Sequence, residues 1–140
     1  EEIMNQPTIN LVCSYAICAA HRLYRPDWSK DKNVKVFGKC ANIHGHQYTL
    51  ELNLQGELNH DTGMLINGFD VDTIVKPFLE QSFDHKYLNE DVAFFGDKQP
   101  TAEWIAVWVY DQLKSKFPEH ATLKKVKVFE TPELAVEYPI

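Results

Sequence analysis

The sequence predicts an α+β domain in which an antiparallel sheet carries two helices on one face. Two observations support this prediction. Apolar residues alternate with a period of two near both ends of the chain, and they follow a helical spacing in two segments between. The resulting order is β-β-α-α-β-β, and such grouping of strands and helices is typical of α+β folds. The 140 residues are expected to form one domain, 1–140, because this length suits one compact core.

The first two strands are expected at residues 8–21 and 44–56. In the first strand, the odd-numbered residues are largely apolar and this series ends at His21. The even-numbered residues are a mixture of polar and apolar side chains. In the second, apolar and polar residues alternate cleanly, which indicates a strand with one buried face. The segment 22–39 between them contains Pro26, Gly38 and several charges, so it is expected to be a loop.

The helices are expected at residues 70–82 and 102–116, where apolar residues recur at helical spacing. Pro77 predicts a kink or an interruption in the first helix, and Thr101 is the expected N-cap of the second. Residues 89–99 are expected to be a loop. Two closing strands are expected at 123–130 and 134–138.

Composition and charge exclude several classes of protein. Hydrophobic residues make up 44% and charged residues 24%, close to an average globular chain. The longest apolar run, residues 104–110, has seven residues and is too short to span a membrane. The net charge of −6 favours neither nucleic acid nor an anionic membrane as partner. Three cysteines form no disulfide framework, and the first residues lack a signal pattern, so a cytoplasmic protein is expected.

The strongest local feature is His44-Gly45-His46. On a strand, residues i and i+2 point to the same face about 6.5–7 Å apart, so both rings can reach one cation. His21 lies on the buried parity of its own strand. Three histidines on one face are the ligand set of a catalytic zinc with an open position. The alternative is that these are polar residues satisfied by ordinary hydrogen bonds.

Two further groups could carry chemistry. Cys40 follows Gly38-Lys39, and a thiol beside a metal or a lysine can become a base or nucleophile. Cys13 and Cys18 are instead expected to be small buried residues of an apolar strand. In Asp84-His85, the carboxylate could fix the tautomer of the imidazole, provided that a turn brings the two side chains together.

The last strand pair adds a candidate carboxylate. Glu130 shares the parity of Val126 and Val128, so it could point inward and bind the paired N–H groups of a guanidine-like heterocycle edge. The residues alone favour the alternative, in which Glu130 ends its strand in solvent. The nearby lysines could face a phosphate or water, and the remaining histidines, His60 and His120, are expected at the surface.

Two families share parts of these patterns. The spacing of Gly38, His44, His46 and Glu51 resembles the first cupin motif, but the second cupin motif is absent and two helices suit that barrel poorly. A more extensive resemblance covers residues 14–138 and is to the 6-pyruvoyl-tetrahydropterin synthase family, which includes 6-carboxytetrahydropterin synthase. The order and spacing of the matching pieces carry it: Ala19-Ala20-His21-Arg22-Leu23, Phe37-Gly38-Lys39-Cys40, His44-Gly45-His46-x-Tyr48, Gly56-Glu57, Thr62-Gly63-Met64, Asp84-His85-x-x-Leu88-Asn89, Pro100-Thr101-Ala102-Glu103 and Glu130-Thr131.

This resemblance implies a T-fold whose sheets join in trimers, two of which stack into a homohexamer with active sites at subunit interfaces. It implies Zn²⁺ as cofactor and 7,8-dihydroneopterin triphosphate as substrate, which loses triphosphate with internal redox. The implied residue roles are metal ligands His21, His44 and His46; a catalytic thiolate, Cys40; a proton relay from a neighbouring subunit, Asp84 and His85; and pterin binding by Glu130 with Thr101 and Thr131 nearby.

The resemblance leaves the product open. The three residues between Cys40 and His44 resemble the carboxy-forming enzymes of the queuosine route, whereas the long segment before Cys40 resembles the pyruvoyl-forming enzymes. Gln47 and Cys18 depart from the residues usual at these positions. We expect a pyruvoyl-forming enzyme of the tetrahydrobiopterin route, with the carboxy-forming enzyme and a non-catalytic pterin-binding protein as alternatives.

Overall fold

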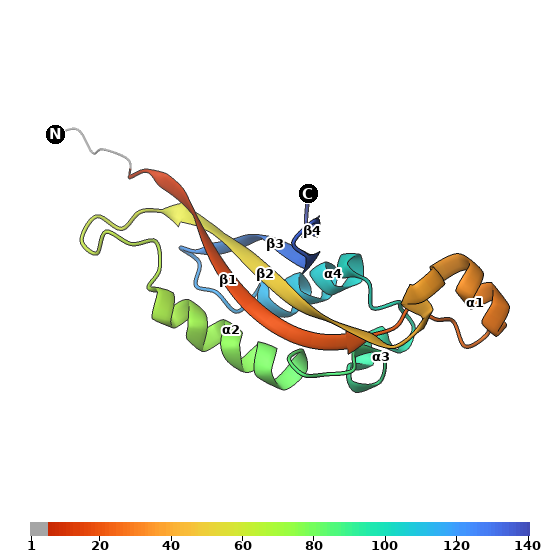
Figure 1. Ribbon diagram of the computed structural model, residues 1–140. Helices are drawn as coiled ribbons and strands as arrows, with labels where there is room; N and C mark the ends of the chain where they lie inside the picture. Colours follow the sequence, from red (N-terminus) through yellow and green to blue (C-terminus); the bar gives the residue numbers. More distant parts are fainter. Residues whose placement is uncertain (1–5) are drawn as a thin grey trace.

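The computed structural model describes residues 6–140, and one antiparallel sheet forms its frame (Figure 1). The four strands lie in the order of the sequence, and every neighbouring pair is antiparallel. They are β1 (Thr8–His21), β2 (His44–Glu57), β3 (Thr122–Thr131) and β4 (Leu134–Tyr138). The predicted fold class is confirmed, and the predicted strand limits agree to within one residue. The cupin interpretation is wrong, because this sheet is flanked by helices and does not form a jelly roll.

Two helices, α2 (Gly68–Ser82) and α4 (Ala102–Leu113), cover one face of the sheet (Figure 1). Side chains from the covered face and from both helices form a single core, and its fully buried members include Leu50, Val75, Ile105 and Val126. Each fully buried aliphatic side chain stabilises the fold by about 1.5–3 kcal/mol. In the described part of the chain no helix covers the opposite face, and strand residues such as Val12 and Cys18 are exposed there.

Side-chain N-caps fix where α2 and α4 begin. The Asn67 side chain accepts the Phe69 N–H, so α2 begins at Gly68, two residues before the predicted start. The predicted interruption at Pro77 is wrong, since α2 continues to Ser82. Burial of the flanking Val75 and Phe78 compensates for the lost backbone hydrogen bond. Thr101 caps α4 as predicted, and α4 ends at Leu113 rather than at 116.

The connection between β1 and β2, residues 22–43, is called the arm below. Its residues 22–39 were expected to be a loop, but the arm contains α1 (Lys30–Phe37) and the 3₁₀ helix η1 (Gly38–Ala41). Ser29 caps α1, Asn33 is fully buried, and Trp28 stacks on Phe37 with ring centroids 5.8 Å apart. These local contacts stabilise α1 in place of an apolar face packed against the core. Sequence periodicity therefore could not detect this helix.

The segment 89–99 was also expected to be a loop. It holds part of α3 (Leu88–Asp91) and the 3₁₀ helix η2 (Ala93–Gly96), whose buried residues are Leu88 and Phe95. Single helical turns are too short to show a period of 3.6 residues. Among residues 6–140, no helix is long and apolar enough to cross a membrane.

Candidate metal centre

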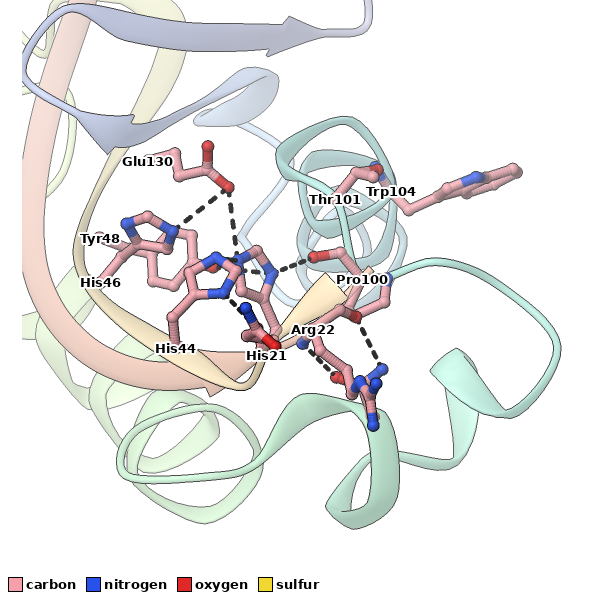
Figure 2. A network of polar contacts seen from close by, with 11 residues as sticks. His21, Arg22, His44, His46, Tyr48, Pro100, Thr101, Trp104 and Glu130 are labelled. Atoms are coloured by element: carbon pink, nitrogen blue, oxygen red, sulfur yellow. Dashed lines mark hydrogen bonds and ion pairs between the residues drawn. The ribbon is translucent and has the colours of Figure 1, made fainter. Parts of the chain in front are cut away.

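Three histidines converge where β1 ends and β2 begins. His21 is the last residue of β1 and His44 the first of β2, and they are direct partners in the sheet register. His46 lies two residues along β2, on the same side as His44. One ring nitrogen from each of the three lies within 4.8 Å of the others, and Figure 2 shows the three rings facing one another. The predicted convergence is therefore present.

Backbone carbonyls orient two of these rings. The Nδ1 atom of His21 lies 2.7 Å from the Pro100 carbonyl oxygen, and that of His44 lies 2.7 Å from the Asn42 carbonyl oxygen. Because a carbonyl oxygen can only accept, both rings must carry a proton on Nδ1. In the neutral rings, both Nε2 atoms then present lone pairs, yet they lie only 3.0 Å apart. Two such lone pairs are stabilised by a cation that both can bind.

Burial favours the neutral form of these rings. It lowers the pKa of His21 to about 4, an effect that the Pro100 carbonyl opposes and the other two histidines strengthen. Burial also lowers the pKa of His46, against the attraction of Glu130. At neutral pH these imidazoles are therefore unprotonated, which is the form that binds a metal.

The donor set fits zinc. Three imidazoles, joined by no fourth nitrogen or sulfur ligand among residues 6–140, match a catalytic zinc site with an open coordination position. His21 is 1% exposed and lies at the base of the cluster, while His44 and His46 are partly exposed, so the open position faces outward.

Glu130 reaches this cluster from β3. Its Oε1 atom lies 3.6 Å from His21 Nε2 and 3.8 Å from His46 Nε2 (Figure 2). The side chain is 20% exposed and points toward the histidines, so the solvent-facing orientation that the residues alone favoured is wrong. A carboxylate in this position can accept hydrogen bonds from a ligand that sits over the open side of the cluster.

Sequence reasoning missed three residues that position the cluster. Asn42 and Pro100 act through backbone carbonyls, which no sequence motif reveals. Tyr48 was given no role in the site; it is fully buried, and its hydroxyl lies 3.3 Å from His21 Nδ1. The alternation of β2 could have indicated this, since Tyr48 has the same parity as His44 and His46.

Asp84 and His85 form a second polar group beside β1. One Asp84 oxygen accepts the Cys18 N–H at 3.0 Å, and the other lies 3.0 Å from His85 Nδ1. His85 has φ of 60°, and this backbone turn allows the two neighbouring side chains to meet. Burial raises the pKa of Asp84, but its hydrogen bonds to Cys18 and His85 outweigh this and lower it overall.

A cleft of about 570 Å³ connects this pair with the metal centre. Its lining includes Cys18, Gly45, His46 and His85. His85 is 81% exposed and belongs to the cleft, not to the three-histidine group. The expectation that Cys18 is buried is wrong: its parity on β1 places it on the face without helices. Cys13 is partly buried.

Cys40 lies in η1, four residues before His44, and its thiol is exposed. The three-histidine group does not include it. The 3₁₀ turn of η1 presents Cys40 to solvent while the next residue, Ala41, is buried. The thiol is thus accessible on the connection that leads into His44.

A groove of about 660 Å³ adjoins the cluster, and its lining includes His46, Gln47, Glu130 and Thr131. Thr101 follows the Pro100 carbonyl that orients His21. A larger hollow of about 1000 Å³ lies at the far end of β2 beside the exposed His60 and His120. Within the described residues it gathers no set of three ligating side chains, so the chemistry is placed at the histidine end.

The family profile described as 6-pyruvoyl tetrahydropterin synthase matches residues 10–139. The human 6-pyruvoyl tetrahydrobiopterin synthase is 40% identical over 122 residues, covering 86% of this chain and 83% of the relative. A Bacillus subtilis 6-carboxy-5,6,7,8-tetrahydropterin synthase is 31% identical over 101 residues, covering 68% and 66%. The solved Caenorhabditis elegans 6-pyruvoyl tetrahydropterin synthase superposes with a TM-score of 0.88 at 31% identity, covering 97% and 98%. The chain therefore belongs to the 6-pyruvoyl tetrahydropterin synthase family of lyases.

Proposed function

We propose that the protein is a zinc-dependent, cytoplasmic 6-pyruvoyl-tetrahydropterin synthase. Its substrate is 7,8-dihydroneopterin triphosphate, from which it eliminates triphosphate while the dihydropterin ring is reduced and the side chain is oxidised. The observation that carries this proposal is the histidine cluster, whose unprotonated Nε2 atoms converge beside the Glu130 carboxylate. Relatives named for this activity support it.

Ligand binding follows from the groove. The Glu130 carboxylate accepts the N–H donors of the pterin ring, and Thr131 lines the same groove. The family resemblance also assigns Thr101 to the surroundings of the ring. This places the substrate side chain over His21, His44 and His46. When bound there, zinc supplies Lewis-acid chemistry that acidifies the hydroxyl and adjacent C–H groups of the side chain.

In this proposal, Cys40 and the Asp84–His85 pair carry out the proton transfers. The Cys40 thiolate removes a proton from a side-chain carbon, and the C–O bond to the triphosphate breaks with its electron pair leaving on the triphosphate. His85, oriented by Asp84, accepts and returns the protons that the tautomerisation moves. The electrons lost by the side-chain alcohol carbons stay in the molecule as the reduced ring, so no external redox cofactor is required.

Assembly completes the site in this proposal. His85 is largely exposed and lies outside the histidine group, which favours its action on the metal centre of a neighbouring chain. The face of the sheet without helices is available for joining subunits. The proposed assembly is a homohexamer of two trimers.

One observation favours a second activity, that of a 6-carboxy-5,6,7,8-tetrahydropterin synthase. Only three residues separate Cys40 from His44, a spacing that resembles the carboxy-forming enzymes, and the Bacillus subtilis relative carries that name. The two activities share the metal centre, the thiol and the substrate, but they differ in whether the side chain is cleaved.

Mass spectrometry of the products distinguishes these activities. The zinc-loaded protein is incubated with 7,8-dihydroneopterin triphosphate and no reductant or partner enzyme. The proposal predicts 6-pyruvoyl-tetrahydropterin and inorganic triphosphate. Formation of 6-carboxytetrahydropterin with acetaldehyde would assign the second activity. Unchanged substrate with zinc bound would indicate a binding protein and refute the catalytic role of Cys40.

A further inference from the structure

The arm is strongly basic, although the protein is acidic. Residues 22–43 contain six lysines or arginines and two aspartates, a net charge of +4. The other 118 residues contain eight basic and 18 acidic residues, a net charge of −10. An organic triphosphate carries several negative charges and is repelled by a surface of the latter sign. The arm is therefore the part of the chain that attracts a polyanion.

The lysines of the arm are accessible and, in the part of the chain that the structure describes, have no carboxylate partner, whereas its Arg25 is paired with Asp27. Its four lysines, Lys30, Lys32, Lys35 and Lys39, are all exposed. Among residues 6–140, no carboxylate lies within 4.0 Å of any of them. Outside the arm, five lysines do have such a partner: Lys76, Lys98, Lys114, Lys125 and Lys127. Unpaired lysines retain their full attraction for an anion in solution.

The arm is held firmly next to the metal centre. It starts directly after His21 and ends directly before His44, which are partners in the sheet. The Asn89 side-chain amide donates to the Arg22 carbonyl and accepts the Arg22 N–H, and Gln99 bonds both backbone groups of Tyr24 in the same way. The Leu23 N–H donates to the Cys40 carbonyl, joining the two ends of the arm.

The arm is also rigid toward its tip. Asn33 is buried and bonds the backbone of both Arg25 and Ser29. Lys32 Nζ lies 4.2 Å from the centre of the Trp28 ring, which itself stacks on Phe37. The lysines of α1 therefore project from a fixed scaffold and not from a mobile loop, so their field has a constant direction relative to the histidines.

We propose that the arm is the electrostatic docking surface for the triphosphate end of the substrate. This inference rests on the proposed function, because it assigns the arm to the phosphate part of that ligand while the pterin part lies near Glu130. Lys30, Lys32 and Lys35 increase the rate and affinity of substrate binding and take no part in the proton transfers. Their contribution therefore enters kcat/KM and ligand affinity, weakens with added salt, and leaves kcat unchanged.

Binding of inorganic tripolyphosphate to the full-length, zinc-loaded protein gives the first test. The arm variant is K30E/K32E/K35E, and the control variant K114E/K116E/K124E makes the same charge change at three exposed lysines near the far end of α4 and the start of β3. Calorimetry at low salt is expected to show at least about tenfold weaker binding for the arm variant and less than about twofold change for the control. Equal losses in both variants, or no loss in the arm variant, would overturn the inference.

Turnover at low and high salt gives the second test. The arm variant is expected to lose kcat/KM for 7,8-dihydroneopterin triphosphate at low salt, to recover much of it in about 0.5 M salt because the screening length shortens, and to keep its kcat. Binding of unphosphorylated 7,8-dihydroneopterin is expected to be unchanged, which shows an intact fold. The neutral variant K30Q/K32Q/K35Q is expected to lie between the arm variant and wild type.

The two proposals fail separately. Arm-dependent tripolyphosphate binding without any turnover by the wild type would leave the docking surface standing and refute the proposed function. Normal turnover by the wild type, with unchanged kcat/KM and tripolyphosphate affinity in the arm variant, would support the proposed function and refute the docking surface. A changed oligomeric state of the arm variant in size-exclusion chromatography would identify the arm as a subunit contact and overturn its assignment to the triphosphate.

Discussion

The Nε2 atoms of His21 and His44 lie 3.0 Å apart, while both Nδ1 atoms are engaged by backbone carbonyls. Two unprotonated nitrogens at this distance repel each other unless they share a cation. The sheet register fixes this arrangement, because the two residues are partners at the ends of β1 and β2. The strand pair thus builds a site with a positive ion as its natural occupant.

Replacing His44 with alanine is expected to release zinc, because only two imidazoles of the group remain. Affinity is expected to fall at least about a hundredfold, more than losing an outer hydrogen-bond partner usually costs. Elemental analysis after dialysis measures this directly. His120→Ala, at an exposed position near the far end of β2, is the matched control and should keep one equivalent. One equivalent of zinc on the His44→Ala protein would remove His44 from the ligand set.

Replacing Cys40 with alanine is expected to lower kcat by about 10²–10⁴-fold, the usual contribution of a positioned acid or base. Zinc content and assembly should stay the same, since Cys40 is exposed and outside the histidine group. Steady-state kinetics with zinc analysis tests both points. The matched control is Cys13→Ala, which deletes the same atoms from the middle of β1. Full activity of Cys40→Ala would refute its role.

Asp84 is expected to stabilise the fold in a pH-dependent way. Its pKa is lowered in the folded state, so its stabilisation is present above the unfolded value of about 3.9 and is lost as the pH falls through the folded value. Asp84→Asn is therefore expected to lower the free energy of unfolding by about 1 kcal/mol at pH 7, with the difference shrinking below about pH 4. Urea unfolding from pH 7 to pH 3 measures it; a constant difference would contradict this account.

Gly56 is expected to tolerate no side chain. A Cβ atom there would collide with the His120 backbone carbonyl and come within 2.7 Å of Leu65 Cδ1. Gly56→Ala is expected to destabilise the protein by about 1–3 kcal/mol in urea unfolding. Gly68→Ala, at the start of α2 with open space around it, is the control and should be neutral or slightly stabilising. Equal stability of the two variants would show that the His120 segment moves away easily.

The sequence predicted the strands and helices in which apolar residues recur at a regular spacing. Strand alternation located β1 and β2 and placed His21, His44 and His46 on the inner face, because a strand fixes the direction of every second side chain. Helical spacing located α2 and α4 for the same reason. Neither short helix could be found in this way, because local contacts such as that of Trp28 with Phe37 stabilise α1 and because α3 is a single turn.

The site was predictable only in part. Side-chain ligands have recognisable residue types, whereas Pro100 and Asn42 orient the rings through carbonyl groups that every residue has. The burial of Cys18 was predicted wrongly because apolar neighbours on a strand do not reveal which face the helices cover. The meeting of Asp84 and His85 depends on the positive φ of His85, a backbone conformation that no motif in the sequence signals.

The most direct test of the central claim is a metal titration of activity. Chelated protein is reconstituted stepwise with zinc, and the release of triphosphate from 7,8-dihydroneopterin triphosphate is followed at each step. Activity is expected to be absent without metal and to rise linearly to a plateau at one zinc per chain. Full activity of the metal-free protein, or a plateau unrelated to zinc occupancy of the histidine cluster, would contradict this expectation.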